Sequence, residues 1–229
     1  MFYLFYTNAI NMDNLIKMVF KPETNKELHE AVNKWCNNKE EAIKEYGDIN
    51  TWNTSLITNM YQLFMNKINF NDNINNWDTK NVINMQNMFT ACKKFNQPLN
   101  NWNTSNVTNM NYMFCGCKEF NQSLNNWNTT KVINMRIMFY NCKNFNQPLN
   151  NWDTSNVKYM ENMFNKCDNF NQNLDNWNLK SLNNCDEMFH GCCLYSYPLF
   201  SWTDYDIIIN TPIFDRAINK KIQSEINLM

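Results

Sequence analysis

Tryptophan recurs at an interval of 25 residues along most of the chain, and this interval constrains the fold more than any other feature. The series consists of Trp52, Trp77, Trp102, Trp127, Trp152, Trp177 and Trp202. A fixed period of about 20 to 50 residues is typical of arrays in which each repeat stacks on its neighbours. One repeat has too few apolar side chains to offset the entropy of ordering its backbone, so the repeats must fold together.

Other residue types keep the same period and indicate which positions form the core. Positions are counted from the tryptophan of each copy, which is position 0. Apolar side chains recur at positions 5, 8, 11, 12, 15, 18 and 22; in the copy that begins at Trp102 they are Val107, Met110, Met113, Phe114, Cys117, Phe120 and Leu124. Methionine and aromatic residues at such a spacing are typical of a core, so these columns are expected to be buried.

Within each copy, the segment Asn-Met-x-x-Met-Phe-x-x-Cys has apolar residues at i, i+3, i+4 and i+7. This spacing predicts a short helix or 3₁₀ segment with one buried face. The segment Phe-Asn-Gln-Pro-Leu alternates apolar and polar residues, which predicts a short strand or extended arm that Pro98 and Pro148 make irregular. Asn-Asn-Trp-Asn/Asp-Thr-Ser is typical of turns. Columns of asparagine such as Asn71, Asn96 and Asn121 are expected to form hydrogen-bonded ladders.

Helices are expected at both ends of the array. Thr24 to Glu27 form a capping box, which predicts a helix with a buried face. That face consists of Leu28, Ala31, Val32, Trp35 and Cys36. A second helix is expected over about 39–46, ending at Gly47. After the last tryptophan, Thr211-Pro212 is a typical helix start.

These elements predict an α/β repeat solenoid with helical N- and C-terminal caps. The array has six coils of 25 residues, each a short strand or turn plus a short helix or 3₁₀ segment. The predicted domain boundaries are an unassigned segment over 1–20, a helical N-terminal cap over 21–48, the repeats over 49–202 and a C-terminal cap helix over 203–229.

The repeat also resembles a known family. Trp102 to Asn126 read WNTSNVTNMNYMFCGCKEFNQSLNN, which is similar to the BspA-type leucine-rich repeat, also found in Mycoplasma surface lipoproteins. The resemblance covers about 49–202. It implies a leucine-rich-repeat-like solenoid used for adhesion or protein interaction, as in bacterial surface proteins, some protists and large DNA viruses.

Composition argues against several other functions. The chain has 3 glycines, none close to another, so a glycine-rich phosphate loop is not expected. It has 2 histidines and no C-x-x-C pair, so neither a metal nor a cofactor is expected. A net charge of −1 argues against a nucleic-acid partner. No nucleophile recurs in register with a base, so an enzyme is not expected.

The sequence also carries expectations about location. No stretch reaches the roughly 18 apolar residues that a membrane span needs. The apolar run at the start ends at Thr7 without a basic region before it, which is atypical of a secretory signal. The starting methionine is left open among Met1, Met12 and Met18. A cytoplasmic location, including a host cytoplasm or a virion, is favoured over surface display.

Positions 9, 10, 13 and 14 differ most between copies. Because core columns tolerate little change, such variation is typical of a solvent face. The candidate interaction face consists of Tyr112, Arg136, Ile137, Tyr140 and Glu161. A solvated face without a partner is the alternative interpretation.

These observations predict a non-catalytic protein-interaction scaffold whose protein partner is unidentified. The alternative is a cell-surface or virion-surface adhesin that binds a host protein or a glycan. A monomer is favoured over an oligomer. The recurring cysteines are expected to be buried thiols, and disulfides between repeats remain an alternative for a secreted protein.

Overall fold

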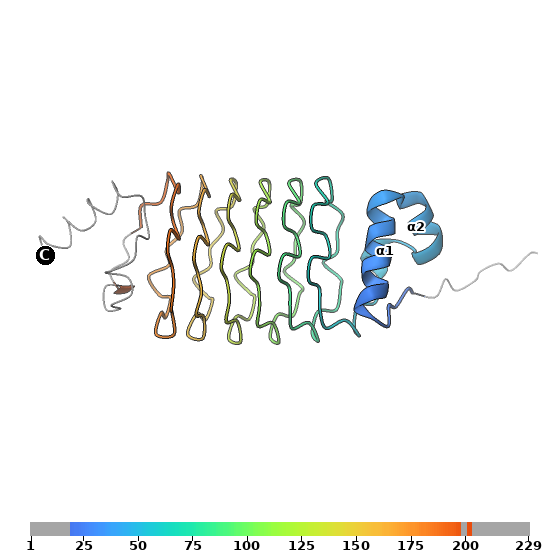
Figure 1. Cartoon of the computed structure of the whole chain (residues 1–229), viewed down its shortest axis with the longest axis horizontal. Coiled ribbons are helices and arrows are strands. Elements are labelled where there is room, and N and C mark those ends of the chain that lie inside the picture. Colours follow the sequence, from blue (N-terminus) through green and yellow to red (C-terminus); the bar gives the residue numbers. More distant parts are fainter. Residues whose placement is uncertain (1–18, 198–200, 203–229) are drawn as a thin grey trace, which may run out of the picture.

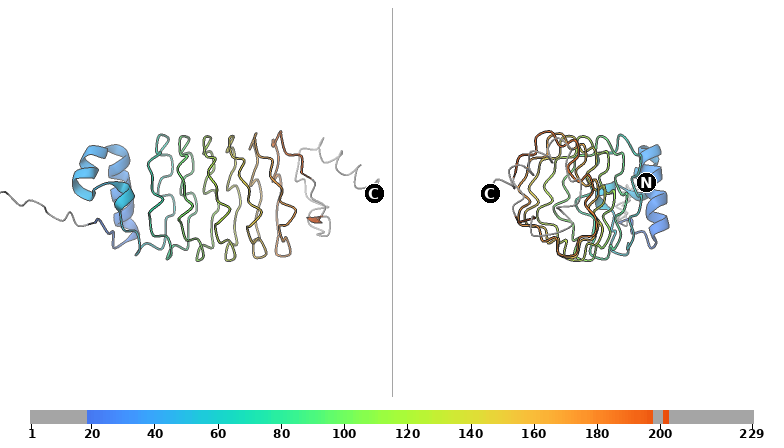
Figure 2. Two further views of the ribbon diagram at one scale, coloured as in Figure 1. Left: turned by 180° about the vertical axis from the view of Figure 1, so that it is seen from behind. Right: turned by 60° about the vertical axis from the view of Figure 1, so that its left-hand side comes forward.

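The structure, a computed structural model, describes residues 19–197, 201 and 202. Two helices, α1 (Asn25–Asn37) and α2 (Lys39–Tyr46), and a single 3₁₀ turn, η1 (Ile49–Thr51), precede the repeats. The repeats then form a row of stacked coils along one axis, as Figures 1 and 2 show. Coils 1 to 6 begin at Trp52, Trp77, Trp102, Trp127, Trp152 and Trp177.

The predicted α/β class is wrong. Over the residues that the structure describes, no coil contains a helix or 3₁₀ segment at positions 7 to 15, and none contains a strand. The only sheet-like contacts there are single parallel bridges at position 7 between neighbouring coils, such as the one between Asn84 and Asn109. The coils are built from linked turns instead.

Positive φ angles explain why the helix-like spacing does not give a helix. Position 10 has φ of 58° at Tyr112, and position 14 has φ of 75° at Gly116, whereas a right-handed helix needs negative φ throughout. The Met113 amide donates to the Met110 carbonyl at 3.1 Å and closes a four-residue turn. The next amide, of Phe114, donates to Met138 of the following coil at 2.9 Å. A left-handed third residue is typical of type II turns. The segment is therefore a series of linked turns and not a helix.

The segment predicted as a strand is irregular for a different reason. The Asn96 amide donates to the side-chain oxygen Oδ1 of Asn71 at 2.9 Å rather than to a backbone carbonyl. Two residues further on, Pro98 has no amide hydrogen to donate. The same side-chain bond recurs from coil to coil, at Asn121, Asn146, Asn171 and Ser196. The predicted asparagine ladder is therefore confirmed, and it takes the place of a backbone ladder.

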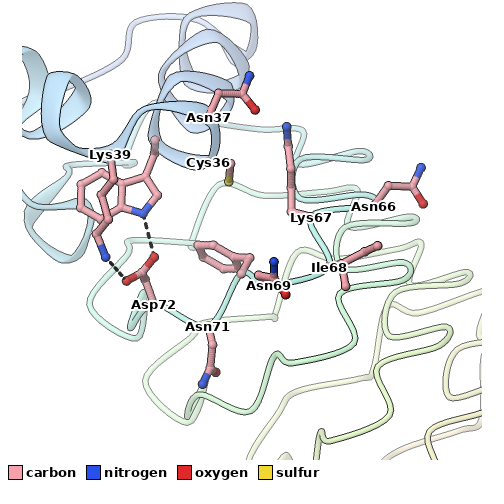
Figure 3. A pocket seen from close by; sticks show the side chains of 11 residues that line it. Cys36, Asn37, Lys39, Asn66, Lys67, Ile68, Asn69, Asn71 and Asp72 are labelled. Carbon is pink, nitrogen blue, oxygen red and sulfur yellow. Dashed lines mark hydrogen bonds and ion pairs between the residues drawn. The ribbon is translucent and has the colours of Figure 1, made fainter.

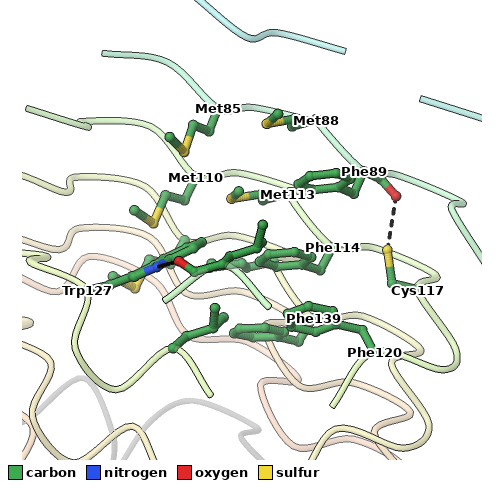
Figure 4. Close-up of a cluster of buried hydrophobic side chains, with 14 of the residues drawn as sticks. Met85, Met88, Phe89, Met110, Met113, Phe114, Cys117, Phe120, Trp127 and Phe139 are labelled. Atoms are coloured by element: carbon green, nitrogen blue, oxygen red, sulfur yellow. Dashed lines mark hydrogen bonds between the residues drawn. The ribbon is translucent and has the colours of Figure 1, made fainter. Parts of the chain in front are cut away.

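The core consists of stacked columns of like residues, part of which Figure 4 shows. The Phe114 ring is fully buried and stacks on Phe120 of its own coil, with centroids 4.3 Å apart. It also stacks on Phe89 and Phe139 of the neighbouring coils, at 5.5 and 5.6 Å. The buried columns predicted from the sequence are confirmed at Val107, Met110, Met113, Cys117 and Leu124 as well.

Polar groups inside the core bond between coils, which explains why these residue types recur. The Trp127 indole Nε1 donates to the Leu99 carbonyl at 3.0 Å. The Cys117 thiol donates to the Phe89 carbonyl at 3.0 Å, drawn in Figure 4. The Thr104 hydroxyl donates to the Asn128 carbonyl at 2.9 Å. Each of these three buried donors therefore finds its acceptor in another coil.

The two helices predicted before the repeats are present and pack on coil 1. The Thr24 side chain caps α1, and Gly47 ends α2 at φ 76°. The rings of Phe20, Trp35 and Tyr46 surround Trp52, with centroids 5.2, 5.8 and 5.9 Å from its ring. The helix predicted over 203–229 lies outside the described residues.

Replacing Phe114 by Ala should destabilise the stack by about 3–5 kcal/mol, because it removes ring contacts on three sides and leaves a cavity. The loss should appear as a lower midpoint in urea unfolding followed by circular dichroism. Asn126→Ala, a change at an exposed turn, serves as the control. A loss below 1 kcal/mol at Phe114 would contradict the packing described.

Candidate interaction surface

The five residues predicted as an interaction face lie on coils 3, 4 and 5. Backbone bonds between coils bring them together: the Tyr112 amide donates to Arg136, and the Ile137 amide donates to Glu161, each at 2.9 Å. Arg136 is exposed, and Tyr112, Ile137, Tyr140 and Glu161 are half-buried. We call positions 9, 10, 13 and 14 of coils 3 to 5 the variable face.

The variable face carries polar groups without partners. Arg136 lies between Asn111 and Glu161 in the column at position 9, and its guanidinium forms no ion pair with the described residues. Asn111 Oδ1 and Glu161 Oε2 are shielded from solvent, and neither accepts a hydrogen bond from this part of the chain. A buried acceptor without a donor costs about 1–3 kcal/mol.

Tyr140 is held by Lys166, which is not among the five residues predicted from the sequence. The Lys166 ammonium lies 3.0 Å from the Tyr140 hydroxyl and 5.4 Å from its ring centroid. The hydrogen bond to Tyr140 raises the pKa of Lys166. Lys166 stands at position 14, one coil after Tyr140 at position 13. Its place in an adjacent variable column was the signal that could have identified it.

The backbone of the variable face is strained at Ile137, which has φ of 58°. A β-branched side chain is disfavoured in this left-handed region by about 1–2 kcal/mol, whereas glycine and asparagine adopt it readily. Asn162 fills the equivalent position in coil 5 with φ of 55°. Isoleucine therefore occupies a position whose backbone conformation disfavours it.

Ile137→Asn should stabilise the chain by about 1 kcal/mol, since asparagine removes the left-handed penalty. The midpoint of thermal or urea unfolding measures the change. Ile133→Asn provides the matched control, because Ile133 is 42% exposed and lacks a positive φ. Equal effects of the two substitutions would show that backbone strain is not the cause.

A groove lies where α1 and the start of α2 meet coil 1, and Figure 3 shows it. Its volume is about 750 Å³, and Trp35, Lys39, Lys67 and Asp72 are among its lining residues. Asp72 accepts from the Trp35 indole at 2.8 Å and from the Lys39 ammonium at 2.5 Å, which ties the helices to the coil. This groove is not predicted by the sequence. The available signal was Lys67, which stands where later coils carry cysteine.

The cysteine column is buried and offers little reactivity. Burial raises the pKa of the Cys117, Cys142 and Cys167 thiols well above their ordinary value. At Cys36, beside the groove, burial raises the pKa to about 11. Among the residues described, no group of three His, Cys, Asp or Glu side chains could hold a metal ion.

Alkylation with iodoacetamide at pH 8 should therefore modify exposed Cys193 in the native protein and leave Cys117, Cys142 and Cys167 unmodified. The raised pKa values keep the buried thiols protonated at this pH, and the core excludes the reagent. Peptide mapping by mass spectrometry measures each site, with the urea-unfolded chain as the control. Native labelling of Cys117 at the rate of Cys193 would contradict the buried column.

No helix in the described part of the chain is long and apolar enough to cross a bilayer.

Among known proteins, a family model described as "Mycoplasma protein of unknown function, DUF285" matches residues 27–139 and again residues 120–226. No curated protein and no solved structure matches the chain. The family match agrees with a repetitive chain and does not test the narrower resemblance to BspA-type leucine-rich repeats.

Proposed function

The chain belongs to the Mycoplasma DUF285 family, and we propose that it is a non-catalytic scaffold that binds another protein through the variable face. One observation carries the proposal. The coils share most of their buried columns and the same pattern of turns, while positions 9, 10, 13 and 14 present different side chains. A constant framework with varied outward residues is how repeat proteins form extended binding surfaces.

The side chains of the variable face suit a protein partner. Tyrosine and arginine are enriched at protein interfaces, and Tyr112 on coil 3 lies one coil before Arg136 and Tyr140 on coil 4. Half-burial restricts the two tyrosines before binding, and Tyr140 is also bound by Lys166, which lowers the entropy that they lose on association.

The proposal assigns no reaction to the chain. Arg136, Glu161 and the two tyrosines are spread along the outside of three coils, an arrangement that suits contact with a broad surface. We also propose that the repeats are of the BspA leucine-rich type. The support for this is the sequence WNTSNVTNMNYMF and its copies.

Photo-cross-linking tests the variable face directly. The full chain, with benzoylphenylalanine in place of Tyr112, should cross-link to one or a few proteins in a lysate of the organism that encodes it. Combining this probe with Arg136→Glu and Glu161→Arg should remove most of the cross-linked product, because the charges at position 9 of coils 4 and 5 are reversed. Mass spectrometry identifies the captured chains.

The control reverses an exposed pair of the same charge type on α1, Lys26→Glu with Glu30→Lys, whose ionic groups lie 3.6 Å apart. Capture should persist in this control. Equal capture by the wild-type and reversed variable faces would refute the proposal. Capture that disappears after enzymatic deglycosylation of the lysate would instead favour the adhesin alternative.

A further inference from the structure

Lysine gathers along one edge of the stack, at positions 15 to 17. This lysine edge consists of Lys67, Lys93, Lys94, Lys118 and Lys143. All except half-buried Lys67 are exposed. The same positions of coils 1 to 6 hold two carboxylates, Glu119 and Asp168. Five lysines against two carboxylates give a surplus of three positive charges, in a chain whose net charge is −1.

The backbone holds these lysines in neighbouring coils. The Glu119 amide donates to the Lys93 carbonyl, and the Asn144 amide donates to the Lys118 carbonyl, each at 3.2 Å. Stacked rings of position 12 show that successive coils are 5.4 to 5.6 Å apart. Lysine side chains carried by coils at this spacing repel one another unless an opposite charge lies between them.

The chain itself neutralises only part of the lysine edge. Lys94 pairs with Glu119 at 2.6 Å, and Lys143 pairs with Asp168 at 3.0 Å. The ammonium groups of Lys67, Lys93 and Lys118 form no ion pair with any residue that the structure describes. Three consecutive coils therefore each present a cation that is available to a ligand.

The lysine edge begins in the groove beside α1. Figure 3 shows the Lys67 side chain extending past Cys36 toward the end of α1 that carries Asn37. The one carboxylate that lines this groove, Asp72, is already bound by Trp35 and Lys39. Lys67 is therefore not neutralised there, and the groove is a suitable place for one end of a linear anionic ligand.

Three features distinguish between anionic ligands. Single-stranded nucleic acid binds on exposed aromatic rings, and positions 15 to 17 hold none in coils 1 to 6. Bidentate recognition of phosphate is typical of arginine, whereas the cations here are all lysine. In an extended peptide, side chains on one face recur about every 6.6–6.8 Å. This distance is slightly longer than the spacing of the coils, and flexible lysine side chains can span the difference.

We propose that the lysine edge is a second binding surface, separate from the variable face, and that its ligand is an extended acidic segment of a polypeptide. Carboxylates on one side of that segment pair with Lys67, Lys93 and Lys118 in turn. Ion pairs of this kind are exposed and screened by salt, so each contributes little free energy. The lysine edge therefore serves to attract the acidic segment and to orient it.

Fluorescence anisotropy of the full chain with a fluorescein-labelled (Glu-Ser)₆ peptide tests the proposal. Lys93→Glu with Lys118→Glu should weaken binding by about tenfold or more, because two attractive charges become repulsive. Lys158→Glu with Lys180→Glu makes the same change in net charge at exposed lysines elsewhere and should weaken binding less than about twofold. Glu119→Gln with Asp168→Asn should strengthen binding, since it releases Lys94 and Lys143.

Equal losses in the two lysine variants would overturn the proposal, because net charge alone would then explain binding. Binding of (dT)₁₂ or a heparin oligosaccharide as tight as that of the peptide would overturn the choice of ligand. The variant Arg136→Glu with Glu161→Arg should bind the peptide within about twofold of wild type, which separates this edge from the variable face. Circular dichroism melting confirms that each variant is folded.

Discussion

Hydrogen bonding from one coil to the next is the interaction on which the rest of the structure depends. Between positions 8 and 15, successive backbone amides alternate in their role: one donates to a carbonyl of the following coil, and the next closes a turn within its own coil. This alternation requires left-handed residues at positions 10 and 14. The turns keep each coil short and aim the methionine and phenylalanine side chains inward. The outward side chains are left on a backbone that the neighbouring coils hold in place.

Stacking of identical residues explains why the repeat tolerates so little change in its buried columns. Buried tryptophan, cysteine and threonine side chains of the repeats donate to carbonyls of other coils, as Trp127, Cys117 and Thr104 show. A substitution at one of these positions disturbs the coil that carries it and a neighbouring coil as well. Outward positions lack this double constraint, so the variable face and the lysine edge can differ in charge and shape while the stack stays the same.

Much of the architecture could be predicted from the sequence because it depends on periodicity. The interval of 25 residues identified the core columns, and the capping box at Thr24 identified α1. The α/β class was wrong because spacing of i, i+3, i+4 and i+7 fits linked turns as well as a helix. Asn66, Gly116, Asn141 and Gly191 at position 14 were the evidence for left-handed backbone. The groove and the Lys166 contact depend on residues distant in sequence, which periodicity alone does not bring together.

The hydrogen bonds of the core also give the stack a direction. Tryptophan and cysteine donate toward α1, while threonine and the backbone amides at positions 8, 10, 12 and 14 donate away from it. A whole unit of 25 residues inserted between two coils would meet the same donors below and the same acceptors above. An inserted segment of any other length would shift every column out of register at once. Duplication or loss of complete units is therefore the route by which such a chain can change its length during evolution, and with it the extent of the surface it presents.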